Sequence, residues 1–199
     1  MINYPNGKKN KALSSPSCPK TKSTSRRGMT LENEINLTNE YYLQINRANI
    51  HKKPTPITIV NVDYPSRNKA KITEAYFKVA STTDYNGVYK GKAIDFEAKE
   101  SHDLHRFPFT SIHDHQIQHL KNVVYHGAIA FVIIRFTRYD ETYLVDANQI
   151  IELYYGKRKS IPYQWFKENA PLIPYGLTPP INYLNVVDQL YLRGKENDK

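Results

Sequence analysis

Apolar residues near the start of the chain recur at the spacing of an α-helix. One face of a helix from Thr30 to about Asn46 is marked by Leu31, Ile35, Thr38, Tyr42 and Ile45. Thr30 is suited to cap the first turn, because a threonine hydroxyl accepts a hydrogen bond from a free backbone N–H at that position. The pattern therefore predicts an amphipathic first helix.

After this helix the pattern changes to short extended segments. Residues Ile57 to Val62 alternate in the manner of a strand, following a basic turn from His51 to Pro56. The stretch from Asp63 to Lys78 has two extended patches but lacks a strong apolar face. We interpret it as a protruding, partly stranded excursion from the folded body.

Turn-forming residues lead into a strand in the middle of the chain. The segment from Asp84 to Gly87 has turn chemistry, and a strand is predicted from Ala93 to Ala98. Either Asn86-Gly87 or Lys90-Gly91 is able to close a hairpin onto this strand.

The second half of the chain alternates helices and strands. A helix is predicted from Ile112 to His126, ended by Gly127, and the apolar run from Ala128 to Phe136 is typical of a central strand covered on both faces. A shorter strand follows at Thr142 to Val145. The remaining predicted helices are Asp146 to Tyr155, Ser160 to Asn169 and Asn182 to Arg193. This order favours an α/β fold with a mixed sheet flanked by helices.

The composition fits one folded domain in a reducing compartment. The chain has 199 residues, of which 40% are hydrophobic and 12% aromatic. No apolar run reaches the ~18 residues of a membrane helix, and the N-terminus lacks the apolar stretch of a secretory signal. Cys18 is the only cysteine, which excludes an intramolecular disulfide. We therefore expect a cytoplasmic protein without a membrane partner.

The positive charge is unevenly distributed. The formal net charge is +9, and residues 1–28 hold seven basic residues and no acidic ones, so that the remainder carries only +2. Residues 1–28 are rich in serine, proline and lysine and cannot bury enough apolar surface to order themselves. We interpret them as a disordered basic arm, which either neutralises nucleic-acid phosphates or serves as a solubilising leader.

Candidate catalytic residues gather around the strand that holds Asp95, Glu97 and Lys99. Side chains alternate along a strand, so these three share one face, and the upstream Asp84 brings a further carboxylate near it. Two carboxylates on adjacent strands suit Mg²⁺, which activates a bound water and neutralises the attacked phosphate. Lys99 adds positive charge where the phosphate becomes more negative. An ordinary exposed strand face has the same spacing, so spacing alone leaves both interpretations open.

The histidines offer a rival metal site. His115 and His119 are four residues apart on a predicted helix, which is a spacing of zinc ligands. A structural zinc site usually needs cysteine or four closed ligands, and Cys18 stands alone. Solvated or DNA-facing histidines are the alternative interpretation.

Longer blocks of the sequence resemble the RecU family of Holliday-junction resolvases. The blocks occur in the family's order and are Asn3 to Gly7, Arg27 to Glu32, His51 to Pro56, Ser81 to Tyr89, Ile94 to Glu100 and Ile112 to Gln116. The resemblance implies a restriction-endonuclease-like fold with a (P)D…(D/E)xK site. Thr83 stands where a proline often precedes the aspartate of that site, a departure that RecU proteins share.

The resemblance also implies roles for individual residues. Mg²⁺, with Mn²⁺ as a substitute, would be held by Thr82, Asp84, Glu97 and Gln116. The catalytic residues would be Asp84, Glu97 and Lys99, with Lys99 stabilising the transition state, and Glu32 is a possible additional acid. Gln116 also borders the buried stripe of its helix, where a polar group usually has a partner. A glutamine bonded to the helix backbone is the alternative there.

The resemblance further implies a nuclease domain over residues 29–199, with a stalk at about residues 63–80 that reaches toward the centre of a four-way DNA junction. The predicted DNA contacts are Arg67, Lys69, Lys71, Lys52 and Tyr76. A homodimer is expected because a junction is nearly two-fold symmetric. Contacts with the recombinase RecA and the RuvAB branch-migration machinery are also implied. Two alternatives stay open: a nuclease of the same fold acting on other DNA, and a DNA-annealing or recombinase-modulating protein that does not cut.

Overall fold

The computed structural model describes residues 29–66, 68–78 and 82–192. In chain order its elements are α1 (Leu31–Gln44), β1 (Asn49–Lys52), β2 (Ile57–Asp63), β3 (Lys71–Phe77), β4 (Tyr85–Tyr89), β5 (Lys92–Ser101), β6 (Arg106–Pro108), η2 (Phe109–Ser111), α2 (Asp114–Tyr125), β7 (Ile129–Phe136), β8 (Glu141–Asp146), α3 (Ala147–Tyr155), β9 (Ser160–Pro162), α4 (Tyr163–Asn169), β10 (Leu172–Ile173), α5 (Tyr183–Val187) and η3 (Asp188–Leu192).

A six-stranded sheet in the order β1-β4-β5-β7-β8-β10 forms the centre of the body. Strands β5 and β7 run parallel, and the other neighbours pair antiparallel, so the sheet is mixed as predicted. Every residue of β7 is buried, which confirms the prediction of a central strand covered on both faces.

Helices cover both faces of this sheet, with a separate core under each. On one face α1 and α5 bury the side chains of β5 and β7 that include Phe96 and Phe131. On the other face α2, α3 and α4 cover the alternate side chains of β7, including Val132 and Ile134. The alternation of side chains along a strand therefore divides β7 between two cores.

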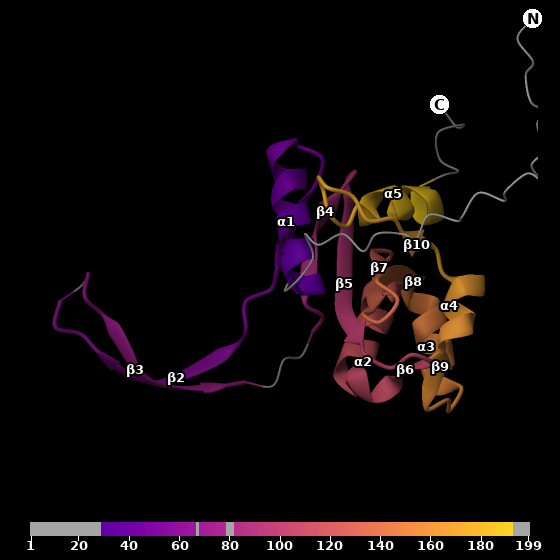
Figure 1. Ribbon diagram of the computed structural model, residues 1–199. Coiled ribbons are helices and arrows are strands. Elements are labelled where there is room, and N and C mark those ends of the chain that lie inside the picture. Colours follow the sequence, from indigo (N-terminus) through magenta and orange to yellow (C-terminus); the bar gives the residue numbers. More distant parts are fainter. Residues whose placement is uncertain (1–28, 67, 79–81, 193–199) are drawn as a thin grey trace, which may run out of the picture.

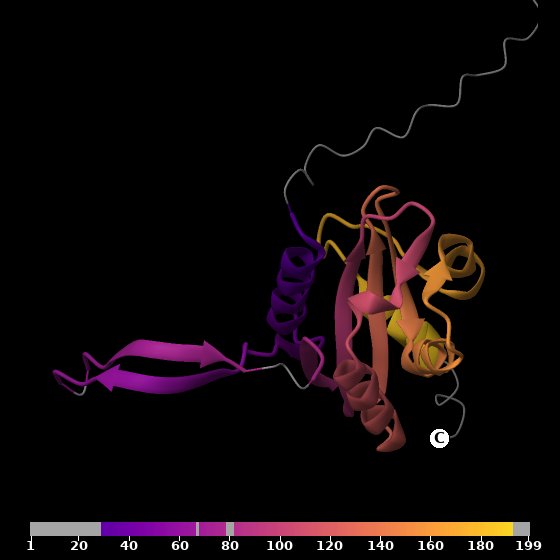
Figure 2. The same cartoon turned by 90° about the horizontal axis from the view of Figure 1, so that it is seen from below.

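Strands β2 and β3 form a separate two-stranded antiparallel ribbon that projects from the body (Figures 1 and 2). The predicted excursion is thus present, but it begins at Ile57 and not at about residue 63. The segment Ile57 to Val62, predicted as a strand, is the outgoing half of the ribbon. No side chain of β3 is buried, which explains why the segment lacks an apolar face.

Local capping was predicted correctly at two helices. The Thr30 side chain accepts a hydrogen bond from the backbone N–H of Asn33 at the start of α1. At the start of α3 the Asp146 carboxylate accepts from the N–H of Asn148.

Three local predictions were wrong. The predicted basic turn begins with strand β1, where His51 and Lys52 pair with β4. The predicted turn Asp84 to Gly87 enters β4. The hairpin is closed by Lys90 and Gly91, both with positive φ, which confirms the second of the two turns considered for it. Gly87 is needed in the strand because a Cβ there would overlap the Asn49 carbonyl of β1.

The third wrong prediction is the helix from Ser160 to Asn169. Its first three residues form strand β9, which pairs with β6, and only Tyr163–Asn169 is helical. The last predicted helix is divided into α5 and the π-helical η3, and its final residue, Arg193, lies outside the described residues, as does the predicted basic arm.

Candidate active site

The antiparallel pairing of β4 with β5 brings Asp84 and Glu97 together. Tyr85 pairs with Phe96, so the residue before Tyr85 lies across from the residue after Phe96. The backbone N–H of Asp84 donates to Glu97 Oε2 at 3.1 Å. Two of the three predicted catalytic residues are therefore neighbours, as expected from the position of Asp84 upstream of the strand.

Glu97 is a buried acid with incomplete hydrogen bonding. Its side chain is 0% exposed, and Lys99 Nζ lies 2.7 Å from Glu97 Oε1. That contact is an ion pair without hydrogen-bond geometry, and Oε1 has no hydrogen-bond partner among the described residues. Burial, together with a hydrogen bond to the Asp84 carboxyl, raises the pKa of Glu97 to about 8, although Lys99 acts in the opposite direction.

Asp95 organises a second group of side chains beside this one. Lys53 Nζ lies 2.8 Å from Asp95 Oδ2 and 2.9 Å from Thr83 Oγ1, and the Thr83 hydroxyl donates to Asp95 Oδ1. His119 Nε2 lies 3.2 Å from the same carboxylate. The backbone N–H of Lys53 also donates to the Asp84 carbonyl at 2.7 Å. Lys53 and Asp95 thus hold the segment that carries Asp84. This role was not predicted from the sequence for either residue.

The two histidines considered as a rival zinc site do not lie together as a pair. His119 contacts Asp95, whereas His115 stacks on His113 with ring centroids 5.3 Å apart. Within the described ranges no three His, Cys, Asp or Glu side chains gather to hold a metal. A cation beside Asp84 and Glu97 would therefore take its other ligands from neutral oxygens and water.

The other predicted metal ligands lie at the border of the site. Thr82 and Asp84 both line a hollow of about 240 Å³ with Lys52 and Lys53. Gln116 is buried on α2, and its Oε1 accepts from the backbone N–H of His113 at 3.1 Å in a capping box. This is the backbone-bonded arrangement considered as the alternative for Gln116, and a role as metal ligand stays a prediction.

The predicted additional acid, Glu32, faces the same region. A neighbouring hollow of about 280 Å³ is lined by Glu32, Asp84 and Lys99 among others. Lys52 is ion-paired with Glu32 on the surface beside it. Asp84 borders both hollows, so the two lie side by side at this residue.

The remaining predicted DNA contacts lie on the ribbon. Lys71 and Tyr76 belong to β3, Tyr76 is exposed, and Lys69 lies in the connection before β3. Arg67 lies outside the described residues.

The donor set fits a magnesium ion. Glu97 is a buried carboxylate paired with the Lys99 ammonium, and because burial raises its pKa, a cation beside it would favour its charged form. Mg²⁺ prefers oxygen ligands and retains several waters, so the Asp84 carboxylate at the hollow and the adjacent Glu97 carboxylate meet its needs. Two acids and an ammonium on a mixed sheet are the arrangement of a metal-dependent phosphodiester hydrolase.

Comparison with known proteins identifies the family. The family model "RecU: Recombination protein U" matches residues 26–189. Two similar curated proteins bear the name Holliday junction resolvase RecU. The one from Oceanobacillus iheyensis is 51% identical over 96% of this chain and 100% of its own length. The one from Bacillus mycoides is 54% identical over 96% of this chain and 98% of its own length. The chain belongs to the RecU family.

One solved structure is also similar, the Holliday junction resolvase Hjc from Archaeoglobus fulgidus. It has 11% sequence identity and a TM-score of 0.36, with 65% of this chain and 90% of that chain covered. No helix in the described part of the protein is long and apolar enough to cross a membrane.

Proposed function

We propose that the protein is a Holliday-junction resolvase, a nuclease that cuts two strands of like polarity in a four-way DNA junction with Mg²⁺. The proposal rests on the family membership together with the buried Glu97 carboxylate, which lies between Asp84 and Lys99. A restriction-endonuclease-like arrangement of the mixed sheet is part of this proposal.

The chain's own residues have distinct tasks in this reaction. The N–H of Asp84 and the ammonium of Lys99 fix the two oxygens of Glu97, which lies buried beneath the hollow that Asp84 and Lys99 line. Lys99 places a positive charge where the attacked phosphate gains negative charge. A bound Mg²⁺ would lower the pKa of a coordinated water and neutralise the phosphate. Thr82 and Gln116 complete the proposed metal ligands.

The projecting ribbon is proposed to enter the junction. Lys69 and Lys71 would contact phosphates and Tyr76 would stack on an exposed base, with Arg67 and Lys52 as further phosphate contacts. A homodimer would place one site on each of the two strands to be cut. Contacts with RecA and RuvAB, a cytoplasmic location and DNA binding by residues 1–28 stay predictions from the resemblance and the composition.

Replacing Glu97 by glutamine tests the site. We expect Glu97→Gln to lower the rate of junction nicking by about 100-fold or more, because the glutamine retains the shape but not the charge that the metal needs. Junction binding in a gel-shift assay should be retained. Glu168→Gln, an exposed change on α4, is the matched control and should cut at the wild-type rate.

The substrate is tested with the wild-type protein. Nicking of a synthetic four-way junction should require Mg²⁺, stop with chelator, and exceed nicking of a linear duplex of the same sequence. Equal rates on both substrates would contradict the resolvase assignment, and unchanged cutting by Glu97→Gln would contradict the site.

A further inference from the structure

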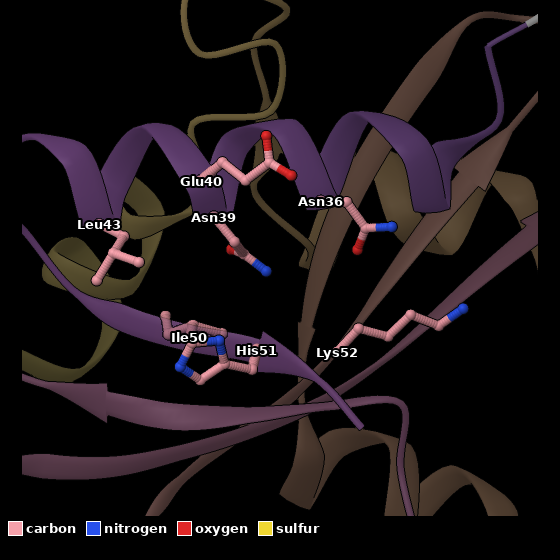
Figure 3. A pocket seen from close by; sticks show the side chains of 7 residues that line it. All are labelled: Asn36, Asn39, Glu40, Leu43, Ile50, His51 and Lys52. Atoms are coloured by element: carbon pink, nitrogen blue, oxygen red, sulfur yellow. The ribbon is translucent and has the colours of Figure 1, made fainter. Parts of the chain in front are cut away.

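A narrow groove lies between α1 and the edge strand β1, next to the candidate active site. It has a volume of about 260 Å³ and is lined by Asn36, Asn39, Glu40, Leu43, Ile50, His51 and Lys52 (Figure 3). Pockets for drug-sized ligands measure roughly 300–1,000 Å³. The groove is therefore suited to a single ring system and not to a larger ligand.

The floor of this groove holds a buried hydrogen-bond donor. Asn39 is only 5% exposed, and its Oδ1 accepts a hydrogen bond from the Tyr183 hydroxyl. That bond orients the carboxamide, so Nδ2 points from α1 into the space above β1 (Figure 3). Asn39 Nδ2 has no hydrogen-bond partner among the described residues. A buried amide N–H without a partner is costly, which indicates that a ligand with an acceptor atom completes it.

The walls of the groove combine apolar and aromatic surface. Ile50 is buried at the base, whereas Leu43 and His51 are exposed at the rim. Leu43 of α1 and Ile50 of β1 supply apolar contact, the His51 ring adds aromatic surface, and Asn39 places a donor at the floor. This combination suits a nucleobase, which has two π-faces and acceptor atoms on its edge. A phosphate would not use the apolar walls, and the Glu40 carboxylate at the rim disfavours a second negative charge.

The groove adjoins a hollow of the candidate active site. Lys52 lines both the groove and the hollow that contains Thr82 and Asp84. Glu32 and Asn39 are seven residues apart on α1, which corresponds to about 10 Å along the helix axis. If the cleaved phosphate of a DNA strand lies beside Asp84, a base one or two nucleotides from that phosphate would thus reach the groove.

We propose that this groove binds one unstacked nucleobase of the strand that is cut, and that Asn39 selects the base through an acceptor on its edge. The inference rests on the proposed nuclease function and adds to it a residue that determines where the enzyme cuts. Because Tyr183 occupies Asn39 Oδ1, the side chain presents its donor alone. It therefore favours bases whose presented edge carries an acceptor, such as purine N7.

The test is a cleavage profile on a junction library with randomised bases around the crossover, read by sequencing the nick positions. The wild type should discriminate about tenfold among bases at one position within two nucleotides of the nick, the effect of about one hydrogen bond. Asn39→Ala should flatten this preference to about twofold or less. Base preferences at other positions should persist in this variant. A general loss of structure would remove those preferences as well.

A second variant leaves Asn39 and Tyr183 untouched. Leu43→Trp fills the groove from its exposed rim and should flatten the base preference at the same position. Gln44→Ala changes an exposed amide at the end of the same helix and should retain the wild-type profile. Wild-type preferences in both Asn39→Ala and Leu43→Trp would overturn the base pocket. The base pocket would also be overturned if the two variants kept the wild-type cleavage profile but changed their oligomeric state. That result would assign the groove to contacts between copies of the chain. A wild type that cuts no junction removes the resolvase proposal itself and this inference with it.

Discussion

At the scale of single residues, the proposed chemistry depends on one buried carboxylate. Glu97 lies between the N–H of Asp84 and the ammonium of Lys99, and its pKa is raised chiefly by burial. The E-x-K spacing placed Glu97 and Lys99 on one face correctly. It gave no sign of Lys53, because the contact between Lys53 and Asp95 joins residues 42 positions apart. Such a contact depends on the fold and not on any local pattern.

The pKa of Glu97 predicts how pH affects the metal-free protein. The folded-state pKa of about 8 lies above the ordinary value of 4.5, so the folded protein retains a proton that the unfolded chain releases. The contribution of this bound proton to the stability of the folded state is complete below pH 4.5 and is lost as pH rises toward 8. Thermal unfolding in chelator should show this decline, and Glu97→Gln should reduce it. If the stability of the Glu97→Gln variant declined equally with pH, the decline would come from other titratable groups.

Magnesium binding should have the opposite pH dependence. The ion competes with the proton on Glu97, so the increase in melting temperature caused by Mg²⁺ should grow between about pH 6 and pH 8.5. At a hundredfold excess over Kd we expect an increase of about 5 °C or more at the higher pH. Glu97→Gln should abolish the increase, and a shift independent of pH would place the ion elsewhere.

At the scale of elements, the successful predictions share a local cause. The caps at Thr30 and Asp146 and the stop at Gly127, with φ of 81°, depend on a few adjacent residues. Strand β1 was missed because only Ile50 of its four residues is buried, so no alternation marks it. Gly87 was assigned to a turn because the close approach of β1 that requires a glycine cannot be seen in the sequence.

The first helix is tied to the central strand by a buried ion pair. Arg135 of β7 contacts the Glu34 carboxylate of α1 and donates to Thr142 Oγ1 at 3.1 Å. The Glu34 and Arg135 side chains are 1% and 4% exposed, so removal of the arginine leaves a buried charge.

Arg135→Met should therefore lower the free energy of unfolding by about 3–5 kcal/mol in urea denaturation. The double change Glu34→Leu with Arg135→Met should recover most of that loss, because it leaves no buried charge. Arg138→Met, exposed after the same strand, is the control. A loss below about 1 kcal/mol in Arg135→Met would show that the pair does not hold α1 in place.

At the scale of the whole molecule, the sheet body and the ribbon are separate parts of the structure. The body encloses two cores, and the candidate site lies on the side where the ribbon joins it. The sequence predicted that the segment protrudes, because it lacks apolar alternation. Its exact start could not be predicted, because the first strand, Ile57–Asp63, looks like an ordinary sheet strand although its side chains remain largely exposed.

Neutralising Arg67, Lys69 and Lys71 together should weaken junction binding and reduce its dependence on salt. If each residue contacts one phosphate, the slope of log affinity against log salt should fall by about 2–3. The control replaces Lys90, Lys92 and Lys167, two of which lie at the hairpin end of β4 and β5, away from Asp84. An unchanged slope in the ribbon variant would exclude phosphate contacts there.

The two legs of the ribbon have a mechanical consequence. The N–H of Lys78 donates to the Pro56 carbonyl at 2.9 Å, which joins the legs at the base of the ribbon. Just beyond that base, the backbone N–H of Lys53 on the outgoing leg donates to the Asp84 carbonyl. The outgoing leg of the ribbon is therefore anchored to the backbone of a proposed metal ligand, so the base of the ribbon and the candidate site share one hydrogen-bonded segment.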